Sequence, residues 1–211
     1  MTQSAAEKPV VAAFDFDGTL TRRDTLFPFL LHVAGPLTFT IKFITLLPTL
    51  CLYALGLMRN DIAKIKVLQR FLANRDLAHL QQQAIDFAEN KLPSLQRSAA
   101  MQRLSWHKQQ GHRCVVVSAS LELYLRPWAL KAGFNDVLCS KLEPIAGGLT
   151  SGKLLGENCF GAEKIRRLQA LLGPREGYTL YAYGDSRGDK ELLSAADFPF
   201  YKSFNQQGQY K

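Results

Sequence analysis

Apolar and polar positions alternate in blocks that predict three buried strands, each followed by polar residues. The strands are expected at Val10–Phe16, Cys114–Val117 and Tyr178–Tyr183, and the polar residues that close them are Asp15 and Asp17, Ser118, and Asp185. Short apolar runs rich in β-branched residues are typical of strands buried on both faces. We therefore expect these strands in the centre of a sheet.

Helical patterns separate the predicted strands. They cover Ser94–Gln110, Leu121–Ala132, Ala162–Leu172 and Lys190–Ala196. Strands that alternate with helices indicate an α/β fold with a Rossmann-like, doubly wound, mostly parallel sheet. Ligands of such sheets bind beyond the carboxyl ends of the strands, so Asp15, Ser118 and Asp185 are expected to be neighbours.

The stretch between the first two strands is far longer than a crossover needs. Ile62–Leu72 and Leu77–Lys91 carry apolar residues at helical spacing, and Leu26–Met58 is apolar. This pattern predicts an all-helical cap inserted after the first strand. The cap would span residues 21–94, on a catalytic core of residues 1–20 and 95–211. A glycine-rich segment, Gly147–Leu154, predicts a small hairpin at the rim.

The apolar region Leu26–Met58 has two interpretations. Lys42 divides it into uncharged pieces shorter than the roughly 18 to 20 residues of a membrane span, and Pro28, Pro36 and Pro48 interrupt it further. A transmembrane hairpin is therefore not favoured. We favour a cap that packs this region internally or in an oligomer. The alternative is a surface that makes peripheral contact with a membrane and admits a lipid phosphate.

Charge and cysteine usage narrow the class of partner. The chain has 47% hydrophobic residues, 21% charged residues and a formal net charge of +8, which fits a globular protein with an anionic partner. We expect no nucleic-acid partner, because no nucleic-acid motif accompanies the charge. The four cysteines show no CxxC pair and are expected to be reduced thiols in a cytoplasmic protein. Residues 1–8 lack an apolar stretch, so we expect a loose tail rather than a signal peptide.

The strongest chemical signal is the sequence Asp15-Phe16-Asp17-Gly18-Thr19. It places two carboxylates two residues apart at a strand end. Gly18 permits a tight turn that brings backbone amides toward an anion.

Four ordered motifs together resemble the haloacid dehalogenase (HAD) superfamily of phosphohydrolases. The motifs are Asp15–Thr19, Ser118, Lys164 and Gly184–Asp189. The resemblance covers residues 10–201, and the position of the cap is similar to the phosphoserine-phosphatase-like branch, subfamily IB. Phosphoserine phosphatases more typically have glycines after the motif serine, where this chain has Ala119 and Ser120. That departure counts against phosphoserine, and Ser118–Trp128 looks like an uncharacterised group of small bacterial hydrolases.

The resemblance implies the catalytic roles. Asp15 matches the nucleophile that forms an aspartyl phosphate. Asp17 matches the general acid and base, and we expect neighbouring carboxylates to raise its pKa. Mg²⁺ is the implied cofactor, with Asp15, the Asp17 carbonyl and Asp185 as its ligands and Asp189 as support for the metal shell.

The remaining matches concern phosphate and substrate. Ser118 and Lys164 are implied to hold a phosphoryl oxygen. The implied phosphate loop also includes Gly18, Thr19 and Ala119. Arg23 and Asp24 fall at the expected pocket mouth. Arg23 either recruits an anionic substrate or is solvated, and Asp24 either binds a substrate cation or caps a helix.

The sequence therefore predicts a Mg²⁺-dependent phosphomonoester hydrolase acting on a small phosphorylated metabolite. Two alternatives stay open. One is a phosphatase for a membrane lipid phosphate, resembling phosphatidylglycerophosphate phosphatases of the same branch, and the other is a phosphotransferase. The oligomeric state is left open.

Overall fold

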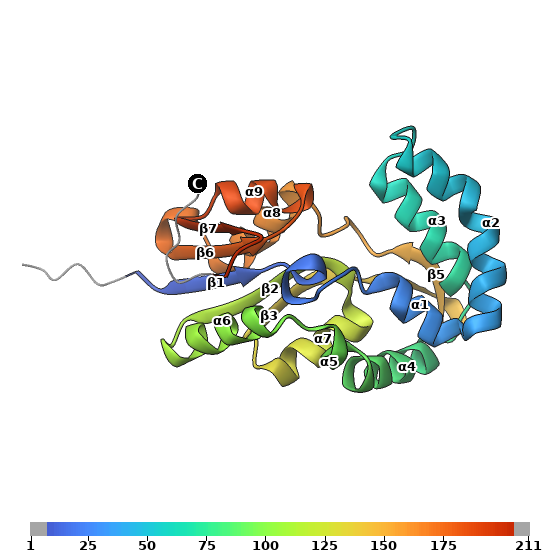
Figure 1. Cartoon of the computed structure of the whole chain (residues 1–211), viewed down its shortest axis with the longest axis horizontal. Coiled ribbons are helices and arrows are strands. Elements are labelled where there is room, and N and C mark those ends of the chain that lie inside the picture. The colour runs from blue at the N-terminus through green and yellow to red at the C-terminus, as the bar shows by residue number, and fades with distance from the viewer. Residues whose placement is uncertain (1–7, 205–211) are drawn as a thin grey trace, which may run out of the picture.

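A five-stranded, all-parallel sheet forms the centre of the molecule (Figure 1). The computed structural model describes residues 8–204, so the tail expected at the N-terminus lies outside them except for its last residue. The strand order is β3-β2-β1-β6-β7. Their bounds are β1 Val10–Phe14, β2 Arg113–Leu121, β3 Asp136–Ser140, β6 Thr179–Gly184 and β7 Phe198–Tyr201.

Helices cover both faces of this sheet because successive strand residues point to opposite sides. The helices are α6 Ser98–Gln109, α7 Glu122–Ala132, α8 Ala162–Leu172 and α9 Lys190–Ser194. On one face Phe14 packs in a large core with Leu104 of α6 and Trp128 of α7. On the other face Val11 and Ala13 pack with Leu168 of α8 and Leu192 of α9. The predicted α/β class is confirmed.

Some elements differ from the sequence-based expectations. β3 and β7 at the sheet edges were not predicted, and the helix expected at Ser94–Gln110 is interrupted. A short α5, Leu92–Leu95, ends before Gln96 and Arg97, which have extended backbone conformations. This break lets the chain return from the cap to the core.

The two ends of the inserted segment lie side by side, where the chain leaves the core and where it returns. Thr21 and Gln96 form an antiparallel bridge. The amide of Arg22 donates to the Leu95 carbonyl at 2.8 Å, and the amide of Arg97 donates to the Leu20 carbonyl at 2.9 Å. The inserted part of the cap is thus joined to the core through one paired connection.

The cap contains helices from the insertion and a hairpin from the core half of the chain. The inserted helices are α1 Leu26–Ala34, α2 Pro36–Ala54, α3 Asn60–Leu72, α4 Leu77–Asn90 and α5. The hairpin consists of β4 Leu142–Ile145 and β5 Leu149–Leu154, so the segment expected to form it supplies only its turn and second strand. The Asn74 amide donates to the Thr150 carbonyl at 2.8 Å, which ties the hairpin to the end of α3.

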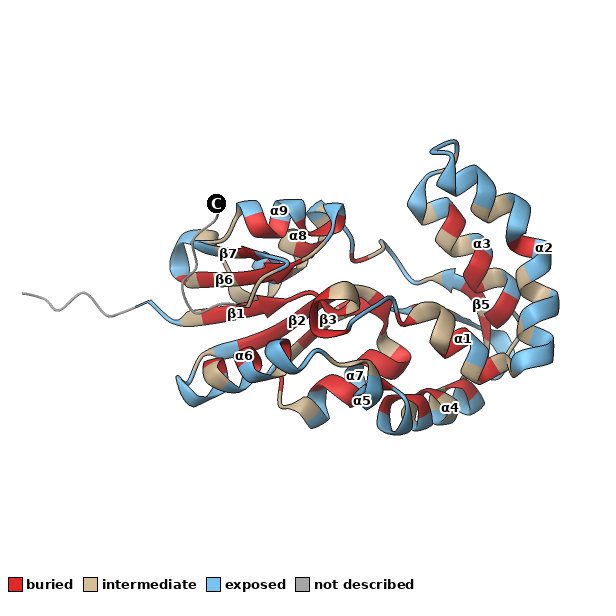
Figure 2. Ribbon diagram, in the orientation of Figure 1, coloured by how far each residue is buried: buried red, intermediate tan, exposed pale blue. Residues whose placement is uncertain are grey.

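Helix α2 differs from every core helix because it is apolar but largely exposed (Figure 2). It continues through Lys42 and Pro48, so the interruption expected at Pro48 is absent, whereas Pro36 begins α2 directly after the end of α1. By length and composition alone, this helix of 19 residues could cross a membrane, because an 18-residue stretch of it has a mean hydropathy of 1.6. Only 6% of that stretch is buried in the protein. Internal packing, one half of the preferred expectation, therefore holds for one face of this helix only, and contact within an oligomer stays a prediction.

Candidate active site

The first motif forms a sharp loop directly after β1. Asp15 is 5% exposed, and its amide donates to the Tyr183 carbonyl of β6 at 2.9 Å. Gly18 has a φ of 79°, and a Cβ atom there would clash with the Asp185 carboxylate. The backbone conformation therefore favours glycine, which also leaves room for the Asp185 carboxylate in its present position.

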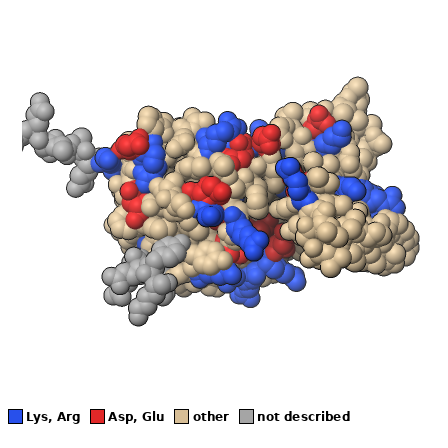
Figure 3. Space-filling model, turned by 90° about the horizontal axis from the view of Figure 1, so that it is seen from above, with Lys and Arg blue, Asp and Glu red and all other residues tan. Residues whose placement is uncertain are grey.

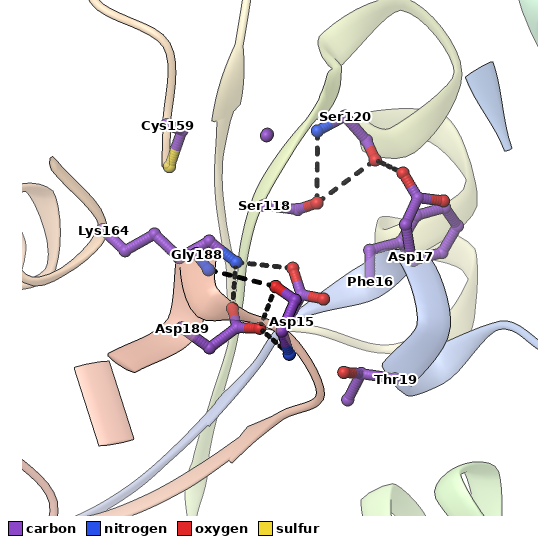
Figure 4. A network of polar contacts seen from close by, with 12 residues as sticks. Asp15, Phe16, Asp17, Thr19, Ser118, Ser120, Cys159, Lys164, Gly188 and Asp189 are labelled. Carbon is purple, nitrogen blue, oxygen red and sulfur yellow. Dashed lines mark hydrogen bonds and ion pairs between the residues drawn. The ribbon is translucent and has the colours of Figure 1, made fainter. Parts of the chain in front are cut away.

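Lys164 joins the first motif to the last (Figure 4). It lies in the first turn of α8, is 2% exposed, and its Nζ donates to Asp15 Oδ1 and Asp189 Oδ1, both at 2.5 Å. Burial alone would lower the pKa of Lys164, but the two carboxylates outweigh it and the pKa is raised. Lys164 is consequently a fixed cation.

The nucleophile candidate Asp15 has an altered pKa. Burial raises the pKa of its carboxyl to about 6 against the opposing effect of Lys164, and the charge of Asp189 adds to the increase. A carboxylate that ionises near neutrality only with the help of a lysine is poorly solvated and strongly dependent on that lysine.

Asp17 points away from Lys164 and toward the β2 loop (Figure 4). Its Oδ1 accepts hydrogen bonds from the amide and hydroxyl of Thr25 at 2.8 and 2.6 Å, and its Oδ2 accepts from the Ser120 hydroxyl at 2.5 Å. Burial raises its pKa to about 7, with the charge of Asp24 next in effect and that of Asp15 smaller. The expected increase is present, but burial rather than neighbouring carboxylates is its main cause.

The end of β2 supplies two hydroxyls and a carbonyl. The Ser118 hydroxyl donates to Ser120 Oγ at 3.2 Å, and the Ser120 amide donates to Ser118 Oγ at 3.1 Å. Both serines and Ala119 line the same cavity as Asp15. The Ala119 carbonyl accepts from Lys64 Nζ at 2.5 Å, so this backbone carries a contact from the cap.

The loop after β6 contributes two further acids. Thr19 donates to Asp185 Oδ1 at 3.2 Å, so the predicted phosphate-loop threonine instead contacts a predicted metal ligand here. Asp189 Oδ2 accepts from the Asp185 amide and from the amide and hydroxyl of Ser186. With Lys164 on its other oxygen, Asp189 is fully engaged, which suits the supporting role expected of it.

The same acids form a group that fits a divalent cation. Oxygens of Asp15, Asp185 and Asp189 all lie within 4.8 Å of one another. Burial raises the pKa of Asp185, and the charge of Asp189 adds to this effect. Three carboxylates facing a single lysine leave an excess of negative charge, and oxygen donors of this kind suit Mg²⁺. The Asp15 and Asp185 carboxylates could serve as ligands. The Asp17 carboxylate is held by Thr25 and Ser120, and the ligand predicted at Asp17 is its backbone carbonyl, which stays a prediction.

A cavity of about 730 Å³ opens above these residues, between core and cap. In Figure 3, Lys and Arg surround a hollow between the two parts, with acidic side chains at its base. Arg23 and Asp24 line the cavity and are exposed. Asp24 Oδ1 accepts from the Leu26 amide at 2.8 Å at the start of α1, so one of its oxygens has the capping contact that was one of the two interpretations.

Four residues of the site were missed by the sequence analysis. They are Thr25, Lys64, Ser120 and Asn158. Lys64 of α3 reaches from the cap to the core, where its Nζ also donates to Asn158 Oδ1 at 2.8 Å. Burial lowers its pKa to about 8. The sequence did contain a signal for Lys64. It lies four residues before Leu68 and seven before Phe71, on the apolar face of α3 that is expected to turn inward.

Comparison with known proteins identifies the family. The profile of the haloacid dehalogenase-like hydrolases matches residues 12–194, and the chain belongs to this family. It is 35% identical over 204 residues to Protein CicA of Caulobacter vibrioides, covering 97% of this chain and 90% of that protein. The predicted family and its hydrolase class are confirmed.

Solved structures share the fold. A protein of unknown function from Bordetella pertussis has a TM-score of 0.78 at 22% identity, covering 92% of this chain and 90% of that one. A phospho-aspartyl intermediate analogue of phosphoserine phosphatase has a TM-score of 0.62 at 17% identity, with 92% and 87% covered. The expected similarity to phosphoserine-phosphatase-like hydrolases is thus confirmed for the fold.

Proposed function

We propose that the protein is a Mg²⁺-dependent phosphomonoesterase that works through an aspartyl phosphate on Asp15. The observation that carries the proposal is the buried Asp15 carboxylate at the base of a cavity, with Lys164 on one of its oxygens and Asp17 two residues away. The fold of a phosphoserine phosphatase in its phospho-aspartyl form supports the same chemistry by analogy.

The chemistry divides into two transfers. In the first, an Asp15 carboxylate oxygen attacks phosphorus, the bond from phosphorus to the ester oxygen breaks, and Asp17 gives its proton to the departing alkoxide. In the second, Asp17 takes a proton from water, whose oxygen attacks the phosphorus and releases phosphate and Asp15. A pKa of about 7 allows Asp17 to hold a proton in one step and to accept one in the next.

Other residues of the chain hold these groups in place. Lys164 offsets negative charge when the phosphate meets Asp15, and Thr25 and Ser120 fix the orientation of Asp17. Ser118 lines the cavity and offers a hydroxyl for a phosphoryl oxygen. Mg²⁺ held by Asp15 and Asp185 would neutralise phosphate charge and orient the phosphoryl group.

The substrate proposed first is a small phosphorylated metabolite, which the cavity can accommodate. A lipid phosphate is a second candidate because part of the cavity wall on the cap side is apolar, next to the polar residues Arg23, Asn60 and Lys64. Phe27, Leu50 and Tyr53 line it together with Asp15.

Cys51 is exposed and the other three cysteines are buried thiols without disulfides, which supports a cytoplasmic location.

Phosphate release from a panel of esters tests the proposal. The panel contains phosphoserine, sugar phosphates, nucleotides and lysophosphatidic acid, each with Mg²⁺ and with EDTA. We expect Mg²⁺-dependent release by the native protein and a loss of about 10³-fold or more in Asp15→Asn. Asp61→Asn, at an exposed ion pair on α3, is the matched control.

The products distinguish the alternatives. Phosphorylated glycerol formed when glycerol is added, without free phosphate, would indicate a phosphotransferase instead. Release that persists in Asp15→Asn would contradict the aspartyl-phosphate mechanism.

A further inference from the structure

Helix α2 presents an apolar stripe to the outside of the cap. The stripe consists of Leu37, Ile41, Ile44, Pro48, Leu52 and Leu55, which recur at helical spacing and are all exposed. Exposed fractions reach 74% at Leu37, 58% at Ile44 and 72% at Leu55. A helix that is apolar on all sides is normally buried, so this stripe indicates a binding surface.

The opposite face of α2 is packed against the cap. The ring of Phe39 lies 5.6 Å from that of Phe43 and 5.3 Å from that of Phe71 on α3, and Leu46 is buried. Arg70 of α3 donates to the Thr45 hydroxyl at 2.9 Å. To span a bilayer, α2 would have to leave these contacts. A helix with one face held by its own domain is suited to lie on a surface instead.

The charged residues near the stripe indicate what kind of surface it would bind. No Asp or Glu occurs between Asp24 and Asp61, and Lys42 falls within that stretch, as does Arg59, which is paired with Asp61. The neighbouring helix α3 adds Lys66 and Arg70, both exposed. In Figure 3 the cap presents a broad uncharged area with Lys and Arg at its edges. Two copies placed stripe to stripe would bring these like charges together, whereas an anionic surface would attract them.

The active-site cavity reaches the same helix. Leu50 and Tyr53, in the last turns of α2, line the cavity that contains Asp15. Tyr53 is 43% exposed, so it borders both the cavity and the outer surface. A surface bound to the stripe would therefore lie beside the opening of the site.

We propose that the apolar stripe of α2 docks the protein on anionic phospholipid membranes, with the helix lying in the interface and the basic residues beside it contacting the headgroups. Docking of this kind combines burial of apolar side chains with attraction to anionic lipids. The proposal concerns binding, so it is independent of the proposed phosphatase activity.

Vesicle flotation tests the proposal with the full-length protein. The vesicles are phosphatidylcholine alone or phosphatidylcholine with 40% phosphatidylglycerol. We expect the native protein to float with the anionic vesicles at least tenfold more than with the neutral ones. The triple variant Ile41→Gln, Ile44→Gln, Leu52→Gln should reduce flotation at least tenfold, and Lys66→Gln with Arg70→Gln should reduce it severalfold.

Matched controls separate docking from general stickiness or misfolding. Leu130→Gln with Leu155→Gln removes two exposed apolar side chains that lie outside the apolar stripe. This double variant should leave flotation unchanged. Thermal unfolding of the triple variant should stay near that of the native protein. A polarity-sensitive fluorophore on Cys51, the exposed cysteine of the described residues, should shift to the blue with anionic vesicles.

The outcomes that overturn the proposal are specific. Native protein that stays in the aqueous fraction with both vesicles would refute it, as would a folded triple variant that floats normally. A native dimer in light scattering that the triple variant converts to a monomer, without flotation, would assign the stripe to a second copy. Bound protein that carbonate washing fails to release would show a spanning helix instead.

Discussion

The core and the cap differ in the kind of destabilising group that they contain. In the core, the buried charges of Asp15, Lys164 and Asp189 are held together by short contacts. In the cap, α2 leaves large apolar side chains in water although its inner face is packed. Buried charge and exposed apolar surface both lower stability. Each is therefore informative about function, and the comparison suggests a reaction in the core and binding by the cap.

The largest effect is expected where the core loses its buried cation. Lys164→Met leaves two carboxylates without their partner, so we expect unfolding to become easier by about 3 kcal/mol and activity to fall by about 10³-fold. Denaturant unfolding and phosphate release measure the two effects.

A second variant separates stability from catalysis. Adding Asp189→Asn to Lys164→Met should restore part of the stability, because one unpaired charge is removed, but none of the activity. Recovery of activity in the double variant would contradict the role of Lys164 at the phosphate.

A pH-dependent effect is expected at Asp17. Its pKa is about 7 in the fold against 3.8 unfolded, so its contribution to stability is complete below pH 3.8 and is lost as pH rises through 7. In EDTA, Asp17→Asn should therefore raise the melting temperature at pH 8 by about 3 °C or more and by much less at pH 5. Activity should fall by about 10² to 10⁴-fold at both pH values. An equal shift in melting temperature at both pH values would contradict the assigned pKa.

A smaller effect is expected for the lysine that joins cap to core. Lys64→Met removes the contacts with Ala119 and Asn158, so the cap should be less well positioned and kcat/KM should fall about tenfold. Lys66→Met, two residues along α3 and exposed, is the matched control and should leave kcat/KM for a soluble phosphate ester unchanged. Equal effects of the two variants would remove the special role of Lys64.

The smallest effect is expected on the outer face of α2, and the packed inner face of the same helix provides the contrast. Leu46→Ala, on the packed face, should destabilise the protein by about 2 to 4 kcal/mol. Ile44→Ala, in the apolar stripe, should change stability by less than about 0.5 kcal/mol. Urea unfolding measures both, and a large loss for Ile44→Ala would mean that the stripe is covered in solution.

The sequence was most informative about the core. Asp15, Ser118 and Asp185 do line one cavity, as predicted, because the carboxyl ends of parallel strands meet at one end of the sheet, although β2 continues past Ser118 to Leu121. The edge strand β7 was missed because Phe198–Tyr201 is short and contains Pro199. The Asp17 contacts with Thr25 and Ser120 depend on how loops meet in space, which no local pattern encodes. The exposure of α2 was equally hidden, since an apolar helix is expected to be buried.

The paired crossing at Thr21 and Gln96 makes the cap a module with adjacent ends. Because the chain leaves and re-enters the core at neighbouring points, residues between them can be exchanged for a segment of another length without parting the sheet. The hairpin β4–β5 sets the limit, because it comes from the core half of the chain and contacts α3. Any exchanged cap would have to keep a surface that matches that hairpin.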